Sequence, residues 1–110
     1  MNIYDTANKL SSEIRASEEY ANYKMAREVI NLKPDLKSEI AKFEQLRYEV
    51  QILQMQTGKI DEEKMKRVQE IYSKIIEIDE VKKYFDAELK FNVLFADINK
   101  IIGDAVKDLV

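Results

Sequence analysis

The chain has 110 residues, the length of one small domain, and folding can bury only about two thirds of the surface that the unfolded chain exposes. Apolar residues make up 45% of the sequence and charged residues 35%, with two Gly and one Pro, a composition that favours long helices. Cys, His and Trp are absent. Their absence excludes disulfides, thiolate or imidazole catalysis, the common zinc sites and thiolate-held iron–sulfur clusters.

The formal net charge is −3, and charges of both signs are spread along the whole chain instead of forming an acidic or basic block. This pattern gives no reason to expect binding to nucleic acid. No run of about 18 apolar residues could span a bilayer, and residues 1–10 lack the features of a signal peptide. We therefore expect a cytoplasmic protein without membrane insertion, folded as a single helical domain over residues 1–110.

The first third of the chain predicts two helices. The first runs from about Asn2 to Ala16, with apolar residues at helical spacing on one face, namely Ile3, Ala7, Leu10 and Ile14. Ser17 is a favourable N-cap for a second, shorter helix that stops near Asn31. The side chains of this second helix that should face inward are Tyr20, Tyr23 and Ile30.

The middle of the chain predicts an antiparallel helical hairpin. Pro34 can open a third helix, in which Leu36, Ile40, Phe43, Leu46, Val50 and Leu53 recur at helical spacing. Thr57 and Gly58 end it, and Asp61 can cap a fourth helix carrying Met65, Val68, Tyr72 and Ile75. Because only a few residues separate the two helices, they must reverse tightly and pack side by side.

The last predicted helix is the longest. Asp79 can cap it, and it runs from Glu80 to about Lys107, a length of about 42 Å at 1.5 Å per residue. A compact globule of this chain length is only about 34 Å across, so the helix would overhang it. The predicted fold is all-α, with about five helices, a central antiparallel helical hairpin and a long C-terminal helix.

Apolar residues cover well over half of the circumference of this last helix. They are Val81, Tyr84, Phe85, Leu89, Phe91, Leu94, Phe95, Ala96, Ile98, Ile101, Ile102, Ala105, Val106 and Leu109. A helix of this kind must be covered on more than one side, and self-association into an oligomeric helical bundle, most simply a homodimer, is the simplest way to cover it. The candidate interface residues are Phe85, Phe91, Asn92, Phe95, Asn99, Ile102 and Val106.

Three residues within this helix have two interpretations each. Asn92 and Asn99 lie seven residues apart inside the apolar arc, where a buried Asn can fix the register of a helix pair or can bond a carbonyl or water within the monomer. Gly103 costs about 1 kcal/mol relative to Ala in a helix interior. It either lets another backbone approach closely or ends or kinks the helix.

Catalytic groups are not evident in the sequence. The densest acidic group, Asp61, Glu62 and Glu63, is explained by its position at a helix start, where the helix dipole favours negative charge. Lys64, Lys66 and Arg67 are interleaved with acidic residues and are typical of a solvated face. We therefore predict a non-enzymatic protein without catalytic residues, cofactor or metal ion.

Three segments resemble the YheA-like branch of the YlbF/YmcA family, and together they span nearly the whole chain. They are Asn2-Ile3-Tyr4-Asp5-Thr6-Ala7-Asn8-Lys9-Leu10, Val50-Gln51-Ile52-Leu53-Gln54-Met55-Gln56, and Phe91-Asn92-Val93-Leu94-Phe95-Ala96-Asp97-Ile98-Asn99-Lys100-Ile101-Ile102. The resemblance implies an all-helical, self-associating cytoplasmic protein. Its better-studied relatives act as accessory factors of a membrane-anchored ribonuclease and affect competence, sporulation and biofilm formation.

Those relatives are also associated with iron–sulfur clusters held by cysteines, which this chain lacks. On the resemblance, the expected partners are a second copy of the chain and another cytoplasmic protein, such as a ribonuclease complex. The expected function is that of a non-enzymatic regulatory or protein-interaction protein. More specifically, the resemblance implies an accessory factor in RNA-processing control. The alternatives are an RNA-binding helical protein and a purely structural oligomer.

Overall fold

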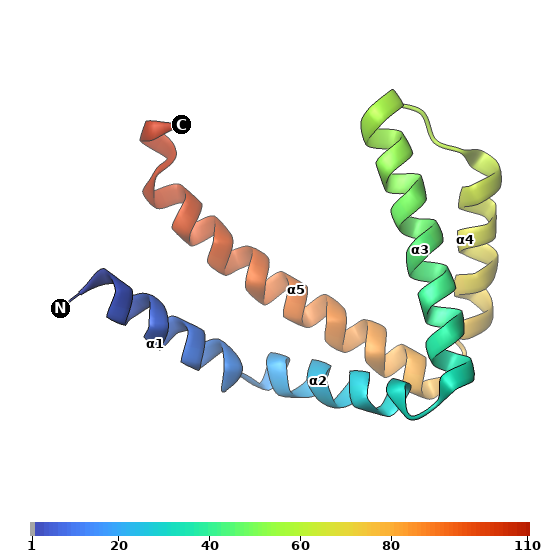
Figure 1. Ribbon diagram of the computed structural model, residues 1–110, viewed down its shortest axis with the longest axis horizontal. Helices are drawn as coiled ribbons and strands as arrows, with labels where there is room; N and C mark the ends of the chain where they lie inside the picture. The colour runs from blue at the N-terminus through green and yellow to red at the C-terminus, as the bar shows by residue number, and fades with distance from the viewer. Residues whose placement is uncertain (1) are drawn as a thin grey trace. The chain divides into compact units, whose positions relative to one another are not determined.

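The computed structural model describes residues 2–110, in which all regular secondary structure is helical and no strand occurs (Figure 1). Its elements are α1 (Ile3–Arg15), α2 (Glu18–Asn31), α3 (Pro34–Thr57), α4 (Glu62–Ile75), α5 (Asp79–Ala105) and the short 3₁₀ helix η1 (Lys107–Leu109). The predicted all-α class with five helices is confirmed. No helix within the described range is long and apolar enough to cross a membrane.

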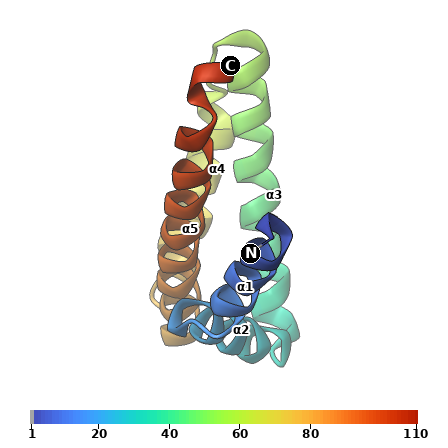
Figure 2. The same cartoon turned by 90° about the vertical axis from the view of Figure 1, so that its left-hand side faces the viewer.

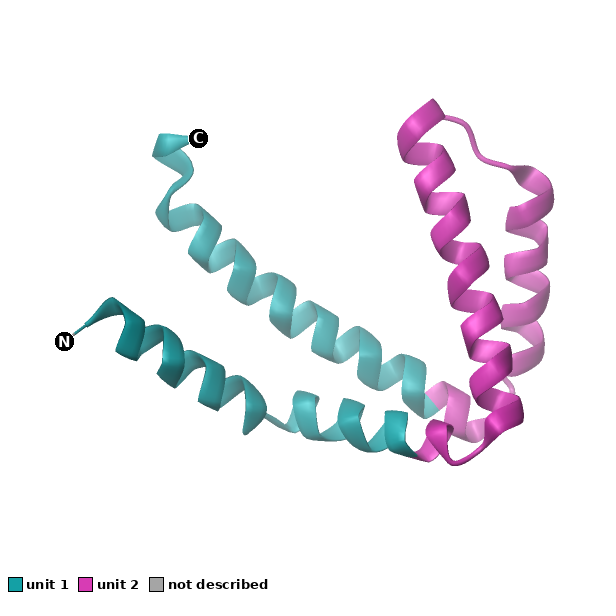
Figure 3. Cartoon of the chain, viewed as in Figure 1, with its two compact units in different colours: residues 1–28, 83–110 teal, residues 29–82 magenta. Residues whose placement is uncertain are grey.

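The chain divides into two compact units (Figure 3). Unit 1 comprises residues 1–28 and 83–110, and unit 2 comprises residues 29–82. Helices α2 and α5 both pass from one unit into the other. The expectation of a single domain stays a prediction.

In unit 2, α3 and α4 form the predicted antiparallel hairpin and lie side by side (Figures 1 and 2). Gly58 ends α3 in the left-handed conformation with φ 72°, which glycine adopts without a side-chain clash, and its N–H donates to the Gln54 carbonyl at 2.8 Å. The Asp61 carboxylate then caps α4 by accepting from the Lys64 N–H at 3.1 Å. Both predicted signals of the reversal are therefore confirmed.

The core of unit 2 consists of apolar side chains from all of its helices. Those that are buried are Ile30, Ile40, Phe43, Val50, Val68, Ile75 and Val81. The Phe43 ring contacts Tyr72 at 5.6 Å between centroids, and the Arg47 guanidinium lies over its face at 5.1 Å. Tyr72 keeps 41% of its surface exposed although its ring contacts Phe43.

In unit 1, α1 and α2 are separate helices because Ala16 and Ser17 form a turn between them. Asn2 caps α1 by accepting from the Tyr4 N–H at 2.6 Å. The predicted Ser17 cap is confirmed, since its hydroxyl accepts from the Tyr20 N–H at 3.1 Å. Helix α5 runs antiparallel to α2 within this unit (Figure 1).

The bounds of the last helix differ from the prediction at both ends. Asp79 was predicted as its cap, which is wrong: the Ile78 carbonyl accepts from the N–H groups of Val81 and Lys82, both at 3.0 Å, and Asp79 is the first helical residue. There its carboxylate can still act on the helix dipole. The α-helix ends at Ala105, so its 27 residues span about 40 Å.

Replacing Ile75 tests the packing of the hairpin unit. Its side chain is 1% exposed, so Ile75→Ala should lower the free energy of unfolding by about 2–5 kcal/mol, and Ile75→Val by about 0.5–1.5 kcal/mol. Urea denaturation followed by circular dichroism measures both changes. Lys74→Ala, on the exposed side of the same helix, is the control and should change stability by less than about 0.5 kcal/mol. Equal stability of the two alanine variants would contradict the described core.

Candidate interaction surface

One face of α5 is covered by aromatic side chains of α2 within unit 1. The Tyr23 ring lies 5.7 Å from Phe91 and 5.8 Å from Tyr84, measured between centroids. Tyr20 meets Phe91 edge-on at 6.3 Å. Aromatic pairs at these separations contribute about 0.5–1.5 kcal/mol each beyond the area they bury. The contacts therefore fix which side of α5 faces α2, and the half-buried Leu94 and Ile98 continue that side towards the C-terminus.

Tyr23 also holds the main polar contact between α2 and α5. Its hydroxyl donates to the Glu88 carboxylate at 3.3 Å, and the Arg27 guanidinium lies 5.7 Å from its ring centroid. Partial burial raises the pKa of the Tyr23 phenol, and the negative charge of Glu88 acts in the same direction. The hydrogen-bonded Tyr84 hydroxyl and the positive charge of Arg27 act in the opposite direction.

The second half of α5 and the turn after it leave large apolar side chains uncovered. Phe95 is 45% exposed and Ile101 is 70% exposed, and the other exposed apolar residues there are Val93, Ile102, Val106 and Leu109. Solvent-exposed apolar residues are unremarkable singly, but a contiguous patch marks an interaction surface. This half of α5 is therefore the candidate site.

The seven candidate interface residues divide into two groups. Phe85 and Phe91 are half-buried within the chain, Phe85 beside the Tyr84 ring at 5.5 Å and Phe91 against α2. The remaining five are exposed. Asn92, Phe95, Asn99 and Ile102 recur every three or four residues along one side of α5, and Val106 follows directly after its end. Phe91 and Phe95 stack on each other at 6.0 Å with nearly parallel rings, so the covered and exposed groups adjoin. We define the α5 face as these five residues with Ala96 and Gly103, which lie on the same side.

Neither asparagine amide has a hydrogen bond to another residue in the described part of the chain. The described residues therefore give no support to the interpretation in which Asn92 and Asn99 bond a carbonyl of the same monomer, and their role stays a prediction. Both side chains point into solvent because α2 covers a different side of α5.

Gly103 has no close neighbour in the described chain. A Cβ atom added to it would meet nothing within 4 Å. The approach of another backbone from the same chain therefore does not explain this glycine. The helix continues for two residues beyond it, and the Val106 N–H then donates to the Gly103 carbonyl at 3.1 Å in a tightened last turn.

The start of α1 is a further exposed apolar segment. Ile3, which the sequence places on one face of the first helix with Leu10 and Ile14, is 79% exposed, and Tyr4 beside it is also exposed. Leu10 and Ile14 on the same face are only half-buried. The helical spacing of these residues correctly predicted the helix. It does not indicate whether another element packs on the apolar face of that helix.

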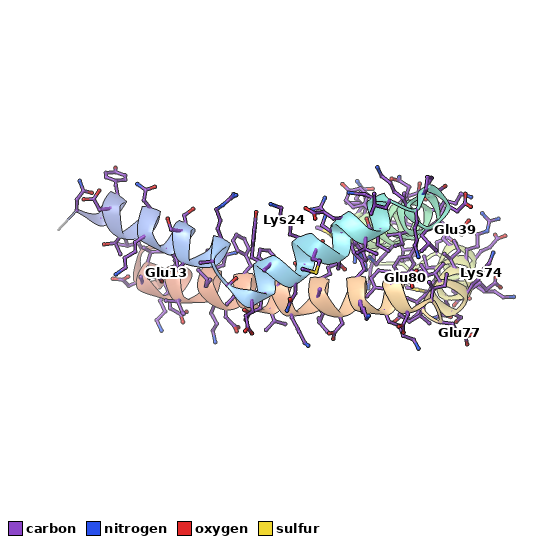
Figure 4. The ribbon with its side chains drawn as sticks, turned by 90° about the horizontal axis from the view of Figure 1, so that it is seen from below. Glu13, Lys24, Glu39, Lys74, Glu77 and Glu80 are labelled. Carbon is purple, nitrogen blue, oxygen red and sulfur yellow. The ribbon has the colours of Figure 1, made fainter. Side chains whose placement is uncertain are left out.

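The acidic side chains of residues 2–110 do not form a metal site. In unit 2, the labelled carboxylates of Glu39, Glu77 and Glu80 come from α3, the α4–α5 turn and α5 (Figure 4). Glu80 is paired with Lys33 in an ion pair. Across residues 2–110, no group of three or more Asp or Glu side chains is placed to hold a metal ion.

The pH dependence of stability tests the Tyr23 contact. Because its pKa is raised in the folded state, the folded chain binds more protons than the unfolded chain as pH rises through 10.0 and above, and the free energy of unfolding falls there. Tyr23→Phe should lose less stability than the wild type between pH 8 and 11, as measured by urea denaturation at each pH. Tyr48→Phe, at an exposed position, is the control for removing one phenol. Parallel curves for wild type and Tyr23→Phe would contradict the assignment.

Known proteins resemble this chain over nearly its whole length. A family model described as "Control of competence regulator ComK, YlbF/YmcA" matches residues 3–107. A UPF0342 protein of Clostridium novyi is 37% identical over 109 residues, covering 98% of this chain and 95% of its own. A UPF0342 protein of Pediococcus pentosaceus is 33% identical, with coverage of 99% and 96%.

A solved structure has the same fold. It is a protein of unknown function (DUF964) from Bacillus stearothermophilus, with a TM-score of 0.81 and 18% sequence identity, covering 97% of this chain and 94% of that one. At that identity the likeness concerns the fold alone. The match of the family model to residues 3–107 and the identity to the Clostridium relative show that the chain belongs to the YlbF/YmcA family.

Proposed function

We propose that this chain is a non-enzymatic, self-associating helical protein that acts as a regulator through protein–protein contacts. The observation that carries the proposal is the α5 face, a row of exposed side chains with Phe95, Ile102 and Val106 at its centre and no charge among its seven members. Interface centres are depleted in charged residues and enriched in aromatic ones.

The exposed apolar side chains of α5 support the same proposal. Phe95 is 45% exposed and Ile101 is 70% exposed, and burying such side chains against a second copy would remove apolar surface from water, which is favourable by about 25 cal/mol per Å².

The regulatory role is proposed from the family, whose description names control of the competence regulator ComK. We place the chain in the YheA-like branch on the basis of the three segments quoted above. In its finer form the proposal is that the chain serves as an accessory factor in RNA-processing control. It would do so without a cysteine-held cluster, because it has no Cys.

Light scattering and thermal unfolding test self-association. We expect a mass of at least twice 12.9 kDa and a melting temperature that falls on dilution, because unfolding is then linked to dissociation. Phe95→Asp should give a folded monomer, since the side chain is already 45% exposed in the single chain and a charge there meets solvent. Asp97→Lys, which alters charge on the polar side of α5, should leave the mass unchanged. A wild type that stays monomeric at high concentration refutes this part of the proposal.

The regulatory part needs a separate experiment. Affinity purification from a native host, followed by reconstitution of the captured protein with the purified chain, should yield a direct complex with a component of an RNA-processing machine. Binding of purified RNA is measured in parallel at low salt, where electrostatic association is strongest. Tight RNA binding with no protein complex would replace the adaptor role by direct RNA recognition.

A further inference from the structure

We infer that α5 pairs with α5 of a second copy in antiparallel orientation, about a two-fold axis that passes Asn99. The inference rests on the proposed self-association and assigns its geometry. It requires that the α5 face be exposed in the single chain and that it be complementary to itself.

Most of the α5 face is turned away from the side of the helix that α2 covers. With about 100° of rotation per residue, Phe91, Leu94 and Ile98 centre about 100° away from Asn92, Phe95, Asn99 and Val106, and Ile102 lies at the border between the two sides. A second helix can therefore lie along the α5 face without displacing Tyr20 or Tyr23 from their contacts with Phe91.

The α5 face is complementary to itself in the antiparallel orientation. When two copies meet at Asn99, residues equally far before and after Asn99 come to the same level across the seam. Phe95 then meets the partner's Gly103, and Ala96 meets the partner's Ile102. In both of these pairs the large side chain lies opposite a small residue, and Asn92 meets the partner's Val106 at the ends of the face. The open space around Gly103, with nothing within 4 Å of an added Cβ, can admit the Phe95 ring of the partner.

Asn99 lies at the centre of this arrangement. A carboxamide carries both donors and an acceptor, so two Asn99 side chains facing each other across a two-fold axis can form reciprocal hydrogen bonds. Buried between two helices, such a pair costs stability in any other register and so fixes this one. In the single chain the same amide has no hydrogen bond to a described residue.

A parallel pairing in the same region fits poorly. It would set Phe95 against Phe95 and Gly103 against Gly103, which crowds one level of the seam and leaves a gap at another. Overpacking and cavities both destabilise a packed interface. Antiparallel pairing also places opposite ends of the two helix dipoles side by side.

The occupant of the α5 face is a second copy on two grounds. The face matches itself in residue size, as a two-fold interface requires. It also carries no charge that would select a partner of opposite charge.

A single cysteine tests the axis, because the chain has no cysteine of its own. Helices packed with axes 8–10 Å apart, each with Cα atoms about 2.3 Å from its axis, bring the two Asn99 Cα atoms to roughly 4–5 Å. A disulfide needs about 4.4–6.8 Å. Asn99→Cys should therefore form a covalent dimer under mild oxidation, and the dimer band should be lost when oxidation is done in denaturant. Asp97→Cys, on the polar side, is the control and should stay largely uncrosslinked.

Mixing two variants tests the orientation. Phe95→Cys and Gly103→Cys should each crosslink poorly alone, while their mixture should give a covalent heterodimer several-fold more abundant than either homodimer. A parallel pairing predicts the reverse, with each variant crosslinking to itself. Asn92→Cys mixed with Val106→Cys gives the same comparison if Gly103→Cys does not fold by circular dichroism.

The outcomes separate this geometry from the proposed self-association. A wild-type monomer at high concentration overturns both. A dimer of twice 12.9 kDa in which Asn99→Cys and the mixed variants do not crosslink leaves self-association standing and overturns the antiparallel α5 pair.

Discussion

The apolar arc of α5 is wider than the side of the helix that α2 can cover, and the exposed features of unit 1 depend on this mismatch. The ring contacts of Tyr20 and Tyr23 hold Phe91 and Tyr84 on one side and thereby turn Phe95, Ile102 and the two asparagines outward. An amphipathic helix needs only one partner, but a helix apolar over more than half of its circumference needs another. The packing that secures unit 1 therefore also creates its exposed surface.

Unit 2 differs from unit 1, because its helices bury their apolar side chains against each other. The left-handed Gly58 and the Asp61 cap reverse the chain within a few residues, and the side chains of Ile40, Val50 and Ile75 are then buried between neighbours close in sequence. Such local closure loses little chain entropy. The hairpin does not need a second copy to bury its core, so the self-association proposed here belongs to α5 alone.

The sequence predicted the helices well because their signals are local. Caps such as Ser17 and Asp61 and the reversal at Gly58 depend on a few neighbouring residues, and all three are confirmed. Exposure depends on distant elements, so the helical spacing that includes Ile3 could not show that Ile3 is exposed. The apolar arc of α5 was visible in the sequence, but which part of it α2 covers required the positions of the aromatic rings.

Gly103 and Asn99 are the residues of α5 that are hardest to explain from one chain. Gly lowers helix stability by about 1 kcal/mol relative to Ala, and Asn is also a weak helix former. In the described structure neither has a contact that compensates, since nothing lies near Gly103 and the Asn99 amide has no hydrogen bond there. Departures from local preference tend to occur where function is served. An antiparallel partner gives a reason for both residues at once, because the glycine makes room for Phe95 and the asparagine meets its own copy.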